Sequence, residues 1–161
     1  MQVGDRYGQL YGGDDPLTTR VGIDPTVRDL TVIPALDIAP PHWITTYPRT
    51  VNATASTVEL VVQLDEPGVV YFLIVPDAAR VPTSREVRAG ITLRPDAVSY
   101  GSITSLRALT QEVAVVVPGL SAVTAYAVWF VAEDKAIDLM LSPKPNLQPA
   151  PVRSLVTTPA P

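Results

Sequence analysis

The fold of this chain is decided by Gly119-Leu120-Ser121-Ala122-Val123-Thr124-Ala125-Tyr126-Ala127-Val128-Trp129-Phe130-Val131-Ala132-Glu133-Asp134. A leucine is followed four residues later by a threonine, and two residues after that by a tyrosine that leads into an alternating strand. This spacing is typical of a strand–loop–strand corner in a β-sandwich, where the tyrosine turns inward and its hydroxyl bonds to the loop backbone. The stretch therefore predicts a fold and indicates no catalytic chemistry.

The composition indicates a folded domain with a substantial core. The chain has 161 residues, of which 47% are hydrophobic, and a formal net charge of −4. The acidic balance and the lack of a basic run argue against a nucleic-acid partner. Because cysteine is absent, a disulfide scaffold, a thiolate metal site and a cysteine nucleophile are excluded. No apolar run is long enough to span a membrane, and residues 1–11 do not resemble a signal peptide.

Further strands are predicted by alternation and by runs of β-branched residues. In residues 57–64, one face carries only valine and leucine, and three of the four residues on the other face are threonine, glutamate and glutamine. The turn Glu66-Pro67-Gly68 then leads into a continuous apolar run over 69–75. Other strands are expected at 45–51, 100–106, 112–117, 126–132 and 152–157.

A short helix is predicted between the strands, in residues 76–90. Thr83 and Glu86 have the spacing of a capping box, in which each side chain satisfies the other's backbone N–H. Gly90 stands where such a helix would end. We therefore expect a helical insertion of about one to two turns.

Four local patterns together resemble a known family. They are residues 61–72, 82–90, 120–126 and 131–134, and in this order they resemble a fibronectin type III-like module of surface and secreted multidomain proteins. The resemblance implies an all-β, seven-stranded, immunoglobulin-like sandwich with the short helical insertion. We expect an N-terminal arm or the end of a preceding domain over 1–37, the module over 38–158, and a Pro-rich tail over 159–161. The family's small turn is replaced by residues 135–141, which carry no Arg-Gly-Asp, so adhesion by that motif is not expected.

The candidate catalytic and metal-binding residues form no complete constellation. His42 is the one histidine, which is too few for a triad or a multi-histidine metal centre. The serines lie in no nucleophile elbow, and no glycine-rich phosphate loop is present. Calcium could bind carboxylates, but neither candidate group has the regular spacing of a calcium loop: Asp14 with Asp15, and Glu133 and Asp134 with Asp138. We expect no enzyme activity, no cofactor and no metal site.

One modification site is predicted. Asn52-Ala53-Thr54 has the form of an N-glycosylation sequon. Asn52 is therefore a glycan acceptor if the chain passes through a eukaryotic secretory route.

The strands at 69–75 and 126–132 carry apolar residues on both faces. In a two-sheet sandwich the outer face should be polar, and monomeric proteins rarely leave large apolar patches bare. Either residues 1–45 fold back over this outer face, or a neighbouring module or subunit covers it. In the second case the contact residues would be Tyr71, Leu73, Trp129, Val131, Leu139 and Met140.

These observations favour a non-catalytic structural or interaction module of an extracellular or cell-surface assembly. Its partners would be neighbouring modules or identical subunits, and it would use neither nucleic acid nor membrane insertion. One alternative is an accessory spacer module of a secreted polysaccharide-degrading enzyme, which would meet carbohydrate only as an attached glycan or as the substrate of that enzyme. Another is a filament or virion subunit that reaches a neighbour with residues 1–37.

Overall fold

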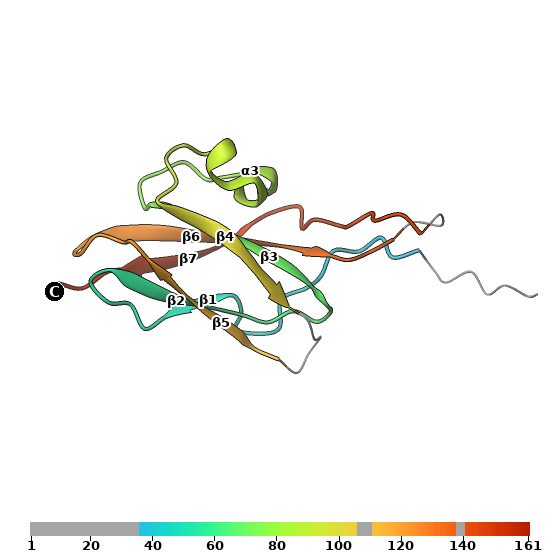
Figure 1. Ribbon diagram of the computed structural model, residues 1–161, viewed down its shortest axis with the longest axis horizontal. Helices are drawn as coiled ribbons and strands as arrows, with labels where there is room; N and C mark the ends of the chain where they lie inside the picture. Colours follow the sequence, from blue (N-terminus) through green and yellow to red (C-terminus); the bar gives the residue numbers. More distant parts are fainter. Residues whose placement is uncertain (1–35, 106–110, 138–140) are drawn as a thin grey trace, which may run out of the picture. The chain divides into compact units, whose positions relative to one another are not determined.

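Seven strands form two antiparallel sheets in the computed structural model, which describes residues 36–105, 111–137 and 141–161 (Figure 1). The three-stranded sheet has the order β1-β2-β5, with β1 at Arg49–Val51, β2 at Thr57–Val62 and β5 at Val113–Pro118. The four-stranded sheet has the order β4-β3-β6-β7, with β3 at Gly68–Pro76, β4 at Ser99–Ser105, β6 at Ala125–Asp134 and β7 at Val152–Thr157. The predicted seven-stranded sandwich with a short helical insertion is confirmed, whereas residues 1–35 of the predicted arm lie outside the described residues.

The main core lies between the two sheets. Alternation places Val58, Leu60 and Val62 of β2 on the inner face, and all three are fully buried. They pack against inward residues of β3 and β6, such as Phe72 and Phe130. The apolar residues that alternate along 57–62 in the sequence are therefore the ones that face this core.

The predicted tyrosine corner is present between β5 and β6. The Tyr126 side chain is buried in the main core, and its hydroxyl accepts a hydrogen bond from the backbone N–H of Ser121 at 2.9 Å. Thr158, just after β7, reinforces the same loop, since its hydroxyl donates to the Ser121 carbonyl at 2.6 Å and accepts from the Thr124 N–H at 3.0 Å. The loop backbone is thus held from both sides.

The helical insertion connects β3 to β4. Helix α3 spans Ser84–Ala89 and is followed by the 3-10 helix η1 at Gly90–Thr92. The capping box between Thr83 and Glu86 is formed as predicted. Gly90 ends α3 at φ 59°, and the ring of Tyr100 lies directly against it, so both the backbone angle and the space require glycine.

The insertion builds a second core on the outer face of the four-stranded sheet. Figure 1 shows α3 on one side of this sheet and the three-stranded sheet on the other. Val87 of α3 packs on Leu73 and Val75 of β3 and on Trp129 and Val131 of β6. The apolar outer face that the sequence indicated is therefore real, and the chain covers it with its own insertion.

Side chains link the edge strand β1 of one sheet to the edge strand β7 of the other. The hydroxyls of Thr50 on β1 and Ser154 on β7 lie 2.8 Å apart and share a hydrogen bond. Gln148, before β7, is buried; its Oε1 accepts from the Ala132 N–H and its Nε2 donates to the Pro41 carbonyl.

In the described part of the chain, no helix is long and apolar enough to cross a membrane.

Candidate functional site

The predicted contact surface lies inside the domain. Leu73 and Val131 are 0% exposed and Trp129 is 7% exposed, because the insertion packs over them. Tyr71 is half-buried at the rim of the same cluster, with the Arg88 guanidinium 5.9 Å from its ring centre. The prediction that these residues form an outward contact was therefore wrong, since it assigned the cover to residues 1–45 or to a partner. Leu139 and Met140 lie outside the described residues.

Several exposed apolar side chains lie instead on the insertion and beside it. Five of the twelve exposed large apolar side chains of the described residues fall between positions 81 and 100. Val81 is the most exposed of them at 64%. The insertion thus buries one apolar face against the sheet and presents another to solvent. The five side chains are Val81, Ile91, Leu93, Val98 and Tyr100.

A shallow groove lies on the insertion. It has a volume of about 300 Å³ and is lined by Arg85, Arg88, Ala89 and Leu93. Arg88 is held by an ion pair in which its Nε lies 2.9 Å from Oε2 of Glu133. Arg85 is exposed and forms no hydrogen bond or ion pair within the described ranges. We call this site the Arg85 groove; it combines an apolar wall with an unpaired guanidinium.

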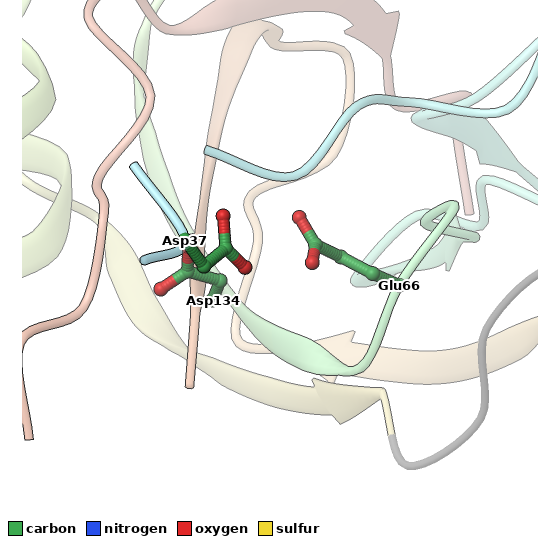
Figure 2. Close-up of side chains that lie close together, drawn as sticks. All are labelled: Asp37, Glu66 and Asp134. Carbon is green, nitrogen blue, oxygen red and sulfur yellow. The ribbon is translucent and has the colours of Figure 1, made fainter. Parts of the chain in front are cut away.

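A cluster of three carboxylates lies at the other candidate site (Figure 2). Asp37 precedes the sandwich, Glu66 lies in the turn before β3, and Asp134 is the last residue of β6. One oxygen from each side chain lies within 4.8 Å of the others. Figure 2 shows the Glu66 carboxylate turned toward those of Asp37 and Asp134. We call this group the acidic end.

The carboxylates of the acidic end differ in their surroundings. Asp134 is buried, and its Oδ1 accepts from the backbone N–H groups of Ala136 and Asn146, while its Oδ2 accepts from Asn146 Nδ2 at 2.7 Å. Its role is to hold the chain after β6. Burial raises the pKa of Glu66, and the neighbouring carboxylates of the acidic end raise it further. The arrangement can therefore receive a cationic group, and Glu66 and Asp37 are the carboxylates that remain available for it.

The carboxylates that the sequence analysis grouped are separated by the structure. Glu133 and Asp134 are adjacent on β6, so their side chains point to opposite faces, and Glu133 joins Arg88 beneath the insertion. Asp138, Asp14 and Asp15 lie outside the described residues. The grouping of Asp37 and Glu66 with Asp134 was not predicted from the sequence. Only the pairing of Gly68 with Asp134, which places the turn before β3 beside the end of β6, links two of these segments, and the sequence does not show that register.

The two remaining predicted positions are on the surface. His42 is exposed, and its Nδ1 lies 3.4 Å from Oδ2 of Asp65, while its backbone N–H donates to Oδ1 of the same residue. Asn52 follows β1 in the left-handed region at φ 48°, is exposed, and donates to the Glu59 carboxylate. Asn52 as a glycan acceptor stays a prediction.

Comparisons with known proteins give little guidance. No protein-family model and no curated protein matches this chain. Among solved structures, the sensor domain of the anti-sigma factor RsgI4 in Pseudobacteroides cellulosolvens is similar over 78% of this chain and 100% of that chain. The identity is 10% and the TM-score 0.40. The function must therefore be argued from the residues of this chain.

Proposed function

We propose that this chain is a non-catalytic interaction module that contacts neighbouring protein modules or subunits through apolar surface. The observation that carries the proposal is the set of exposed apolar side chains on and beside the insertion, among them Ile91 and Leu93. The sandwich already has a filled main core and a filled second core, so this surface is not needed for folding. These side chains fall within residues 81–100, and exposed apolar surface is typical of protein–protein contact sites where it forms a contiguous patch.

The proposed module type is fibronectin type III-like. The tyrosine corner at Tyr126 is a feature of immunoglobulin-like sandwiches. In the constant-type immunoglobulin arrangement the fourth strand belongs to the sheet of the first two strands, whereas here β4 belongs to the other sheet and pairs with β3. The division into three and four strands supports the fibronectin type III-like variant.

The resemblance also supports an extracellular or cell-surface location as part of the proposal. An epitope-tagged chain, expressed in its native host, should be degraded when protease is added to intact cells. A tag that is lost only after lysis would refute the location and leave the interaction role standing.

The alternative role as a spacer in a polysaccharide-degrading enzyme would be favoured by a row of exposed aromatic side chains. Trp129 is buried and Trp43 is half-buried against Phe130, so neither tryptophan offers a flat sugar platform. The observations therefore favour protein contact.

Site-specific photo-crosslinking in the native host tests the interaction role. A benzophenone amino acid at Leu93 should give discrete adducts with protein, because that position lies on the proposed contact surface. Val116 on β5 is the matched control, since it is similarly exposed and belongs to the other sheet. Equal adducts at both positions, or none at Leu93, would contradict the proposal.

A further inference from the structure

The ion pairs of the described residues leave one arginine without a partner. Six arginines lie in these ranges, and five of them form an ion pair with a carboxylate. The exception is Arg85, which stands exposed in the groove. The five pairs are Arg49–Glu112, Arg80–Glu86, Arg88–Glu133, Arg94–Asp96 and Arg153–Asp77.

Unpaired negative charge is found at the acidic end, just as unpaired positive charge is found at Arg85. None of the three carboxylates of the acidic end forms an ion pair with lysine or arginine in the described part of the chain. The charges that act on Glu66 are three carboxylates and His42, which is itself engaged with Asp65. Among the described residues, the acidic end is thus a site of uncompensated charge that a guanidinium would relieve.

The two surfaces cannot meet within one copy. Glu133 and the residues beneath α3 face one side of β6, whereas Asp134 has the parity of Phe130 and Ala132 and faces the other side. Arg85 on α3 and the acidic end therefore lie on opposite faces of the four-stranded sheet. Because they are complementary in charge and separated by the sheet, they can pair only between molecules.

We propose that the Arg85 groove of one copy receives the acidic end of a second copy. This inference rests on the proposed interaction function and names its partner. Arg85 pairs with Glu66 and Asp37 of the neighbour, while the apolar wall of the groove at Ala89 and Leu93 packs against the apolar residues beside that end. Ile38 lies next to Asp37 and is exposed, so the neighbour brings an apolar side chain with its charges. Because the two surfaces differ, the contact is heterologous, and successive copies join head to tail.

Sedimentation velocity of the full chain tests the contact, at concentrations from about 10 μM to about 1 mM, where weak contacts become populated. The mean mass should rise with concentration and fall when salt screens the charges. Arg85→Glu and Glu66→Arg should each weaken association at least about tenfold, because like charges then face each other. A glutamate at position 85 suits the first turn of α3, so this variant should keep the fold.

Complementation separates a direct contact from an indirect effect. An equimolar mixture of the two single variants should associate again, since each supplies the surface that the other lacks. The double variant, Arg85→Glu with Glu66→Arg, should associate by itself. Arg153→Glu is the matched control for net charge, because it reverses an exposed arginine of β7, and it should leave association unchanged.

Each contrary result has a defined meaning. A wild-type chain that stays monomeric at every concentration overturns the inference, as does association that Arg85→Glu leaves unchanged or that the mixture fails to restore. If Leu93 then still crosslinks to a different protein, the proposed function stands and only the identity of the partner is wrong.

Discussion

The tyrosine corner offers the sharpest test of the fold, through Tyr126→Phe. The substitution keeps the ring in the main core and removes one hydroxyl. That hydroxyl accepts a single hydrogen bond, from the Ser121 N–H at 2.9 Å, and the tyrosine is 3% exposed. The change therefore isolates one buried hydrogen bond from the packing around it.

The expected cost of Tyr126→Phe is about 1 to 1.5 kcal/mol. A hydrogen bond contributes about 1 kcal/mol net, and an unsatisfied buried donor costs up to about 3 kcal/mol. Ser121 is exposed, so its freed N–H can reach water and the cost stays near the lower value. For a domain of this size, the melting temperature should fall by about 3 to 6 °C.

Urea unfolding followed by tryptophan fluorescence measures the effect, with Trp43 and Trp129 as the reporters. The transition midpoint should shift while the m-value stays constant. Tyr100→Phe is the matched control, because that ring is half exposed and its hydroxyl forms no hydrogen bond within the described ranges. If Tyr126→Phe cost no more than Tyr100→Phe, the corner would contribute nothing and the reasoning would be refuted.

Three further substitutions test the insertion and the acidic end. Gly90→Ala should destabilise by at least about 1 kcal/mol more than Gly119→Ala, because both glycines have positive φ but only a Cβ at Gly90 would overlap the Tyr100 ring. Equal melting temperatures for the two variants would contradict this. Ion pairing with a guanidinium and the capping bonds lower the pKa of Glu86 to about 2, so Glu86→Gln should lower stability at neutral pH. The difference should shrink as the pH falls from 4.5 to about 2, and a difference independent of pH would contradict the assignment. Burial and neighbouring carboxylates raise the pKa of Glu66, so Glu66→Gln should raise the melting temperature at neutral pH. This gain should vanish below the ordinary value of 4.5, and a loss of stability at neutral pH would refute the electrostatic reading.

The strands and the corner could be predicted because their signals are local. The apolar run in 69–75 falls within β3, and β7 has the bounds that were expected. The alternation predicted over 57–64 covers β2 and continues two residues past its end. The capping box at Thr83 and Glu86 is also local, since each partner lies three residues from the other. These signals do not depend on which elements later meet in space.

The cover of the outer face could not be predicted in the same way. Val87 is the one buried apolar residue of α3, so the helix has no amphipathic stripe that would mark it as a cover. The rest of the cover comes from separated positions, among them Ala79, Ala97 and Leu147. Contacts of this kind depend on tertiary packing, and the excess of apolar residues in β3 and β6 showed only that a cover was required.

The acidic end shows a second limit of sequence reasoning. Its three carboxylates come from three segments, and only the pairing of β3 with β6 links two of them. Asp37 is brought in by the chain that precedes the sandwich, where Asn146 Nδ2 donates to its backbone carbonyl. A site assembled from three distant segments has no spacing that could reveal it.

The insertion covers the second core in this structure and, in the proposed function, also carries the contact surface, and a replacement can separate the two roles. Ile74 pairs with Ser99, so β3 and β4 could be joined by a short Asn-Gly turn in place of the insertion. Such a chain would expose Leu73, Trp129 and Val131, and we expect it to bind the dye ANS and to aggregate. The control is Leu93→Ser in the complete chain, which alters only the exposed surface and should leave the protein soluble and without dye binding. If the shortened chain stayed soluble and did not bind the dye, the insertion would not be the cover of this face, and the second core would not explain the apolar residues of β3 and β6.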